Sequence, residues 1–337
     1  MVTTRGQVNK AMVWEFWQRL ADTTPDGVAH IVRSSVNDDV SWYGPHPINH
    51  LDGVGALVAG FWRPFLHSFP GLRRESDVFL AGEFDGTEWI AATGYFTGVF
   101  AHDWVGIPAT GKVARIRFGE FCRVEGGKIA EIYLLLDLVD LMLQAGHRVL
   151  PPSNGDEAKV PAPRTGDGVL LGPQEDDVTR RSLALVEAML GSMGQYDLDN
   201  PATLSHPSFW RPDMCWYGPF GIGTARGMGE YLPVHQRPFL AAFPDREIAD
   251  HAALFAEGNY TAVTGWPDVV GTHRGAWLGC PPTGRRISMR VMDFWRREGD
   301  LLAENWVLID IVDIFRQFGV DLFARLAEQV EKAATPS

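Results

Sequence analysis

The spacing of apolar residues predicts a helix at the start of each half of the chain. In both places large apolar side chains recur every three to four residues, which puts them on one face of a helix. These residues are Val13, Phe16, Trp17, Leu20 and Ala21 within residues 8–22, and Leu183, Val186, Leu190 and Met193 in the second half. A further apolar run over residues 57–69 contains Pro64, which should make that helix kink or restart at Trp62-Arg63, and Pro238 lies in the same context.

After about Asp77 the pattern changes from helical spacing to short β-branched and aromatic segments. Residues 89–100, 112–124 and 129–137 are such segments, and turn formers such as Phe84-Asp-Gly86 and Glu125-Gly-Gly127 separate them from their neighbours. This texture is typical of antiparallel hairpins. Helices followed by a meander predict an α+β fold in which the N-terminal helices pack on one face of a curved antiparallel sheet.

The chain contains this arrangement twice. Residues 106–146 match residues 279–319 without a gap, including Thr-Gly, Arg, Asp and Gln at the same places. Upstream, the segment DVSWYGP at 39–45 matches DMCWYGP at 213–219, and Arg-Pro-Phe-Leu occurs at both 63–66 and 237–240. Each copy is long enough to bury its own core, so the repeat predicts two tandem domains rather than a solenoid.

A proline-rich stretch separates the two copies. Residues 151–173 contain Pro151, Pro152, Pro161, Pro163 and Pro173 among glycines and acidic residues, with few large apolar side chains. Such composition is typical of a linker. We therefore expect copy one at residues 1–150, a linker at 151–173 and copy two at 174–337.

Composition narrows the class of protein. Hydrophobic residues make up 45% of the chain and charged residues 21%, and the formal net charge is −12. An acidic chain without a basic stripe is a poor match for nucleic acid or for an anionic membrane surface. No apolar run reaches the roughly 18 residues of a membrane span, and the N-terminus has no secretory apolar region. The expected location is the cytoplasm, and Cys122, Cys215 and Cys280 are expected to be buried free thiols without a metal.

Two aspartates are candidates for chemistry. In copy two the side chains of Glu304, Trp306, Leu308 and Asp310 share one face of a strand that leads into a short helix, and Asp137 has the same place in copy one. If that face lines an interior, burial would raise the aspartate pKa toward the range useful for proton transfer. The alternative is that each aspartate only caps the following helix.

Aromatic pairs precede a Gly-Pro turn in both copies. They are Trp42-Tyr43 and Trp216-Tyr217. Such pairs are often part of the core, but Trp and Tyr also place a polar group inside a pocket. Both alternatives stay open for these four residues.

Other polar candidates lie on the expected strands. Arg117 and Arg290 occupy the middle of equivalent strands, where they either face solvent or point inward to bind a carboxylate or an enolate oxygen. His273 lies in a Gly-rich strand of copy two, whereas copy one has Phe100 there. A lone histidine is either structural or part of a site.

Several common catalytic motifs are absent from the sequence. It contains no Walker-type loop, no GxGxxG after a strand, no GxSxG and no HExxH. The chemistry that remains is acid–base catalysis without a cofactor or a metal.

Copy two resembles a known family through several motifs in order. They are AFPD at 242–245, GTH at 271–273, PTGR at 282–285, ENW at 304–306 with Asp310, and RQFG at 316–319. This combination resembles the SnoaL-like polyketide cyclase family (predicted ester cyclases) of the nuclear transport factor 2-like superfamily. Copy one is similar through FPG at 69–71, PATGK at 108–112, Asp137 and QAG at 144–146.

The resemblance implies two cone-shaped α+β barrels, each enclosing an apolar pocket. It also implies an aspartate that serves as acid and base in an intramolecular aldol ring closure without a cofactor, and Asp310 and Asp137 match it. The expected substrate-binding residues are Trp216, Tyr217, His273, Arg290 and Trp306 in copy two, and Trp42, Tyr43, Arg117 and Tyr133 in copy one.

Two functions follow as hypotheses. The first is a cofactor-independent polyketide cyclase-like enzyme that acts on a carbonyl-activated, apolar or polyketide-like small molecule by ring closure or isomerisation. The second is a protein that binds an apolar small molecule without transforming it. Copy two is the better candidate, because only it carries His273 and Asn305-Trp306. The copies are expected to form an intrachain pseudo-dimer, with further homo-oligomers open.

Overall fold

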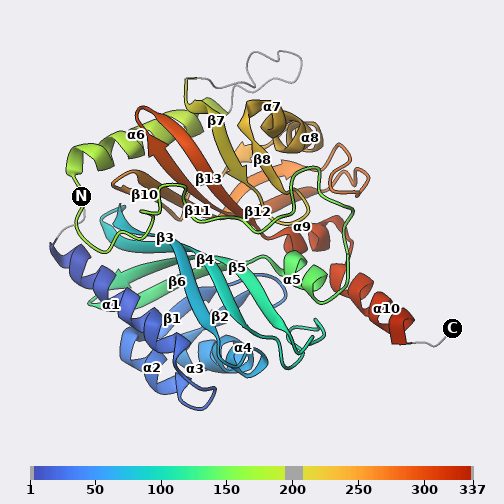
Figure 1. Cartoon of the computed structure of the whole chain (residues 1–337), viewed down its shortest axis with the longest axis horizontal. Coiled ribbons are helices and arrows are strands. Elements are labelled where there is room, and N and C mark those ends of the chain that lie inside the picture. Colours follow the sequence, from blue (N-terminus) through green and yellow to red (C-terminus); the bar gives the residue numbers. More distant parts are fainter. Residues whose placement is uncertain (1–3, 194–207, 335–337) are drawn as a thin grey trace. The chain divides into compact units, whose positions relative to one another are not determined.

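The computed structural model describes residues 4–193 and 208–334, which form two compact units (Figure 1). The first unit consists of residues up to Val149 together with those from Asp310 onward, and the second unit is Leu150–Ile309. These units depart from the expected boundaries at both ends. Residues 151–173 belong to the second unit, and the C-terminal helices belong to the first unit although they follow copy two in sequence.

The first unit is a six-stranded sheet with helices. Its strands have the order β2-β1-β6-β5-β4-β3, with β1 parallel to β6 and the other neighbours antiparallel. Its strands are β1 Val36–Tyr43, β2 His50–Asp52, β3 Arg73–Phe84, β4 Thr87–Val99, β5 Val113–Glu125 and β6 Lys128–Leu136. Its helices are α1 Thr4–Ala21, α2 Val28–Ser35, α3 Gly53–Leu57, the π-helix η1 Val58–Trp62, α4 Arg63–Ser68, α5 Leu138–Gln144, α9 Ile311–Phe318 and α10 Leu322–Ala334.

The second unit repeats this topology. Its sheet has the order β10-β11-β12-β13-β7-β8, with β9 paired to β11 and β7 parallel to β13. Its strands are β7 Trp210–Tyr217, β8 Thr224–Arg226, β9 Glu247–Ile248, β10 Ala253–Glu257, β11 Tyr260–Thr272, β12 Arg286–Glu298 and β13 Leu301–Ile309. Its helices are α6 Asp176–Ser192, α7 Gly227–Tyr231, the π-helix η4 Leu232–Gln236 and α8 Arg237–Ala242.

The α+β prediction is confirmed in both units. The predicted restart of the helix next to Pro64 and Pro238 is also confirmed. A helical run reaches Trp62, widens to π geometry over Val58–Trp62 and restarts as α4 at Arg63, with Pro64 in its first turn. The second unit does the same over Leu232–Gln236 and α8. Proline lacks the amide that would continue the regular ladder, and π-helical turns of this kind often occur at functional sites.

The two sheets differ in how β4 pairs with β5 and how the equivalent β11 pairs with β12. In the first unit, β4 pairs with β5 continuously, with Tyr95 opposite Arg117. In the second unit, the register of β11 against β12 is interrupted between Gly265 and Val269, so that three residues stand where the first unit has one. This β-bulge redirects the side chains of the inserted segment.

The proline-rich stretch forms no helix or strand, as expected of a linker, but it is packed against the second unit. The indole Nε1 of Trp306 donates to the carbonyl oxygen of Pro161 at 2.9 Å, and Asp156 forms an isolated bridge with Thr224. The residues that follow copy one therefore behave as an ordered strap of copy two rather than as a free spacer.

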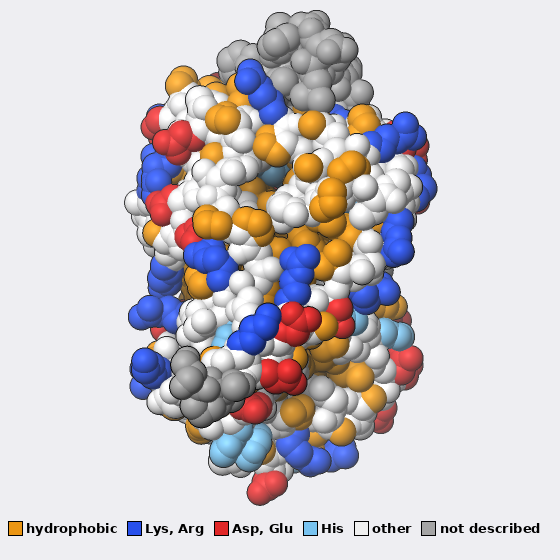
Figure 2. Space-filling model, turned by 90° about the vertical axis from the view of Figure 1, so that its right-hand side faces the viewer, with side chains coloured by type: hydrophobic (Ala, Val, Ile, Leu, Met, Phe, Trp, Pro, Cys, Tyr) orange, Lys and Arg blue, Asp and Glu red, His pale blue; other side chains and the backbone are white. Residues whose placement is uncertain are grey.

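Three further expectations bear on the surface and the thiols. Cys122, Cys215 and Cys280 are buried and free, as predicted. None of the helices among the described residues has the length and apolar character needed to cross a membrane. On the face shown in Figure 2, basic side chains are interspersed with acidic and apolar ones.

Candidate functional site

The second unit encloses a cavity of about 490 Å³ between its helices and the inner face of its sheet. Strand residues that point to it alternate along β12 and β13, as the pleat requires. Aromatic side chains make up much of the wall: Trp210, Trp216, Tyr231, Phe239 and Trp295. A cavity of this size and lining is suited to an apolar small molecule.

Asp293 is a carboxylate in the wall of this cavity. It lies on β12, and the amide Nδ2 of Asn305 on β13 donates to its Oδ1 at 2.9 Å. Asn305 also lines the cavity, and its Nδ2 is held in place by the carbonyl oxygen of Phe294 at 3.2 Å. This hydrogen bond fixes the orientation of the Asp293 carboxyl group at the cavity wall.

A second carboxylate, Asp268, reaches the cavity from the bulge of β11. Its Oδ1 lies 2.9 Å from Nδ1 of His251, which precedes β10. The hydrogen bond to Asp268 is the main cause that raises the pKa of His251 above its usual value. The pair therefore favours an imidazolium next to a carboxylate.

His235 contributes a neutral imidazole to the same cavity. It lies in the π-helix η4 and stacks on Trp216, with ring centroids 4.1 Å apart. Burial lowers the pKa of His235 to about 3, so the ring carries no charge at neutral pH. Within the described residues its Nδ1 has no hydrogen-bond partner, and a bound ligand could supply one.

The equivalent space in the first unit is filled. Only about 10 Å³ remains there, room for at most one water molecule. Immediately before the shared Arg-Pro, the first unit has Phe61 and Trp62 where the second has His235 and Gln236. The larger rings occupy the volume that the second unit leaves open.

An ion pair closes the rest of that space. Arg74 on β3 donates to Glu120 on β5 at 2.5 Å, and both side chains are buried. The guanidinium lies 3.6 Å from the ring centroid of Trp17 and 4.1 Å from that of Phe118. Glu120 occupies the position of Asp293 in the repeat, so in the first unit the equivalent carboxylate is committed to an internal cation.

Asp310 and Asp137 are not among the residues that line the cavity of the second unit. Each is the N-cap of the helix that follows, and its side chain accepts from the amide of Asp313 or Asp140 respectively. Asp310 also accepts from the amide of His46 at 2.9 Å within the first unit. The capping alternative therefore describes the geometry of both aspartates.

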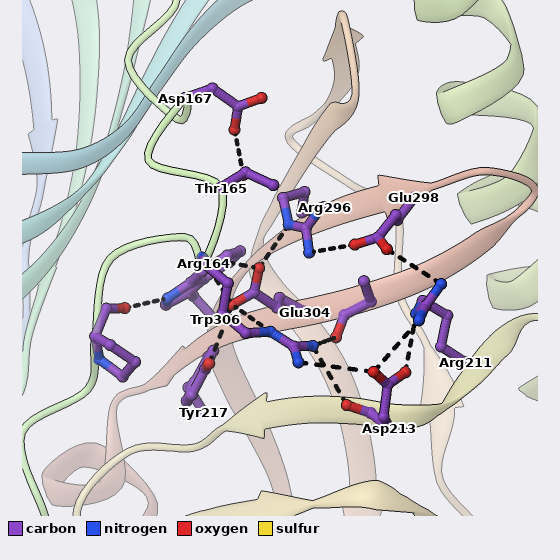
Figure 3. Close-up of polar contacts among 12 residues, drawn as sticks. Arg164, Thr165, Asp167, Arg211, Asp213, Tyr217, Arg296, Glu298, Glu304 and Trp306 are labelled. Carbon is purple, nitrogen blue, oxygen red and sulfur yellow. Dashed lines mark hydrogen bonds and ion pairs between the residues drawn. The ribbon is translucent and has the colours of Figure 1, made fainter.

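Tyr217 and Trp306 alternate along their strands with Trp216 and Asn305, which line the cavity, so their side chains lie on the opposite face of the sheet. Figure 3 shows both near Glu304. They surround Glu304, which is fully buried and accepts from Arg296 Nε at 2.5 Å and from the Tyr217 hydroxyl at 3.1 Å. Arg164 of the strap adds its backbone amide to the same carboxylate at 3.3 Å. This network fastens the strap to the outer face, and Asp293 and Asn305 point the other way.

The remaining predicted residues fall into three places. Trp216 lines the cavity, as expected, and Trp42 occupies the equivalent place in the first unit, packed on Phe61 at 4.9 Å. Arg290 lies over the Trp266 ring at 5.2 Å, and His273 is buried with its Nδ1 at 3.2 Å from Thr283 Oγ1. Neither belongs to the described cavity wall.

In the first unit, Tyr43 and Tyr133 pack on each other and Arg117 is buried. The rings of Tyr43 and Tyr133 stack 4.7 Å apart, and the Tyr133 hydroxyl donates to Glu131 at 2.8 Å. Arg117 is buried, and burial lowers its pKa while Tyr95 and Asp137 oppose that shift.

The prediction from the sequence did not include Asp293 or Asp268, which line the cavity, and it named Asn305 only as a difference between the copies. One available signal was the repeat itself, because an acid stands at the same strand position in both copies, Glu120 and Asp293. A second was the extra segment Trp266-Pro-Asp268, which is present only in copy two. Packing of an apolar core does not require an acidic residue in the middle of a strand, nor an insertion in one copy alone. Both features therefore point to positions with another role.

Comparison with known proteins gives one family. A family model described as SnoaL-like polyketide cyclase matches residues 11–145 and again residues 200–318. Among curated proteins, none matches the chain significantly.

Solved structures similar to one copy include two from bacteria. One is a candidate SnoaL-like polyketide cyclase from Jannaschia sp. CCS1, with 18% identity, 43% of this chain and 94% of that chain covered, and a TM-score of 0.35. Another is IdmH, a candidate polyketide cyclase from Streptomyces antibioticus, with 26% identity, 40% and 99% covered, and a TM-score of 0.33.

Proposed function

Since the chain belongs to the SnoaL-like polyketide cyclase family, we propose that its second unit binds an apolar, carbonyl-bearing small molecule and transfers a proton with Asp293. The observation that carries the proposal is the Asp293 carboxylate in a mainly aromatic cavity, held by Asn305 at 2.9 Å. The first unit, whose equivalent acid is paired with Arg74 in a filled interior, serves as a structural partner.

The proposed step begins when Asp293 removes a proton from a carbon next to a carbonyl group. The electrons of the broken C–H bond form a carbon–carbon double bond, and the carbonyl electrons move to oxygen. For ring closure, the resulting enolate attacks a second carbonyl in the same molecule, and the alkoxide so formed takes the proton from Asp293. For isomerisation, the enolate takes the proton back at another position. General acid–base groups contribute about 10²–10⁴-fold to such steps.

The neutral ring of His235 suits a positioning role in this proposal. An uncharged imidazole has one donor and one acceptor nitrogen, so it can donate to a carbonyl or enolate oxygen without introducing a charge. Its stacking on Trp216 fixes the plane of the ring at the cavity wall. A ligand that reaches Nδ1 also satisfies a polar atom that is buried without a partner among the described residues.

The alternative is a protein that binds such a molecule unchanged. The largely apolar wall of the cavity favours this function as much as catalysis, because the same surface serves both. The two functions differ in whether Asp293 matters for bond breaking or only for affinity.

Deuterium exchange of 2-tetralone, a bicyclic aromatic ketone with exchangeable α-protons, tests the proposal. The wild-type protein in D₂O should accelerate loss of the α-proton signal in ¹H NMR, and Asp293→Asn should lower the catalysed rate by about 100-fold or more. Asp310→Asn is the matched control, because that carboxylate caps α9, and it should keep the wild-type rate. Equal rates for wild type and Asp293→Asn would remove the catalytic role, and unchanged 2-tetralone that is nevertheless bound would favour the binding alternative.

A further inference from the structure

We propose that Asp268 is a second catalytic acid in this cavity and that His251 is the residue that positions and protonates it. The inference rests on the proposed function, because it assigns the proton that must reach the carbonyl oxygen when Asp293 takes one from carbon. It concerns a His–Asp pair that only the second unit can build.

The bulge of β11 creates the pair. Between Gly265 and Val269 the chain holds three residues where the first unit has Tyr95 alone. Trp266 turns to the outer face, where Arg290 lies over its ring at 5.2 Å, and Asp268 turns into the cavity. A Cβ on Gly265 would lie 2.7 Å from Asp268 Oδ1, so glycine at this position leaves the space that the carboxylate occupies.

His251 and Asp268 lie 17 residues apart in the sequence, but the fold brings their side chains into contact. Its Nδ1 lies 2.9 Å from Asp268 Oδ1, and both side chains are largely buried. In the described part of the chain Oδ2 of Asp268 has no hydrogen-bond partner, while the residue lines the cavity. The carboxylate therefore joins the imidazole on one side and offers an oxygen to a ligand on the other.

The charges around His251 all favour its protonated form. Asp268 on β11, Asp293 on β12 and the adjacent Asp250 raise the pKa of His251, the bond to Asp268 being the largest cause, and burial opposes them. Arg246 and Glu247 also line the cavity, one of each sign. The pair consequently keeps its proton to a higher pH than a free histidine would, next to the space where a ligand carbonyl would lie.

The proton balance of the combined step is complete. Asp293 gains the proton from carbon, and the carbonyl oxygen gains the proton that the pair held, donated by Oδ2 of Asp268 in the form of the pair in which Asp268 is the carboxylic acid and His251 is neutral. The products are an enol, a protonated Asp293 and a neutral His251 beside an ionised Asp268. In the return step each proton moves back, so no cofactor or further reactant enters.

Exchange of 2-tetralone measured against pH tests the pair. The wild-type rate should fall as the pH rises through the pKa of His251, because the pair then loses its proton. His251→Gln keeps a hydrogen bond to Asp268 but cannot titrate, so its rate should be lower at pH 6 by about tenfold or more and should lose that alkaline fall. Asp268→Asn should show the same loss, and an unchanged pH profile in His251→Gln would overturn the inference.

A second readout separates this inference from the proposed function. The ¹H–¹³C signals of the His251 ring report its titration with and without bound 2-tetralone, whether or not exchange occurs. We expect the midpoint to fall in Asp268→Asn and to move in the wild type when 2-tetralone binds. If Asp293→Asn abolishes exchange, His251→Gln leaves the rate and its pH profile untouched, and 2-tetralone leaves the His251 midpoint of the wild type unmoved, the pair is wrong and the proposed function stands. If the wild type shows no exchange, the proposed function fails, and the titration alone decides whether the pair contacts the ligand.

Discussion

At the scale of single residues, the two histidines of the second unit respond to their surroundings in opposite ways. His251 gains a carboxylate partner, which raises its pKa, whereas His235 is enclosed by aromatic rings, which lowers its pKa to about 3. The same residue type therefore favours the imidazolium form behind Asp268 and stays a neutral ring at the wall of the cavity.

His235 should make the protein sensitive to acid. Its folded pKa of about 3 lies below the unfolded value of 6.5, so the stability that depends on its neutral form is present above 6.5 and is lost as the pH falls toward 3. At pH 5 the loss should be about 2 kcal/mol. His235→Phe introduces the residue found at the equivalent position 61 and should remove most of this pH dependence. Urea unfolding at pH 7 and pH 5 measures it. An equal loss of unfolding free energy between the two pH values in wild type and variant would contradict the assignment.

At the scale of elements, the tandem organisation and the order of helices and hairpins could be predicted from the sequence. Helical spacing, turn residues and a proline have local physical consequences, and α1, α4 and the β4–β5 hairpin follow from them. The choice of face on β12 and β13 could not be predicted in this way. Both faces of these strands are buried, so apolar alternation does not distinguish the cavity side from the side that the strap covers.

The expected interior face of β13 is therefore not the face that lines the cavity. Glu304, Trp306 and Asp310 formed the expected interior row, but Asn305 and the facing Asp293 are the residues that reach the cavity. The His251–Asp268 pair was beyond prediction for another reason. It depends on a bulge whose register appears only once β11 is paired with β12.

The ion pair between Arg74 on β3 and Glu120 on β5 tests what fills and stabilises the interior of the first unit. Arg74 and Glu120 are both buried, so removal of one partner strands an uncompensated charge. Arg74→Ala should destabilise the protein by about 3–5 kcal/mol in urea unfolding. The apolar pair Arg74→Met/Glu120→Leu should recover most of that loss, and a double variant as unstable as Arg74→Ala would show that the ion pair itself, rather than filled volume, stabilises this unit.

At the scale of the whole molecule, one repeated unit has two different interiors. In the first unit, aromatic rings and an ion pair leave about 10 Å³, and in the second a cavity of about 490 Å³ is lined by Asp268, Asp293 and the neutral His235, among others. A fold alone does not determine function, and here the same fold in one chain supports a packed domain and a domain with a site. The C-terminal helices that complete the first unit come from the end of copy two, so neither copy is a self-contained segment of sequence.

The central claim is that the cavity of the second unit is where a small molecule binds, and the most direct measurement fills that cavity with the side chains of the first unit. His235→Phe/Gln236→Trp reproduces Phe61-Trp62, and isothermal titration calorimetry gives the affinity for 2-tetralone. We predict that the filled variant loses binding by at least about 100-fold, roughly 2.7 kcal/mol, while its unfolding stays cooperative. Trp62→Phe in the first unit, the matched control, should bind as the wild type does. A filled variant with wild-type affinity would contradict the account.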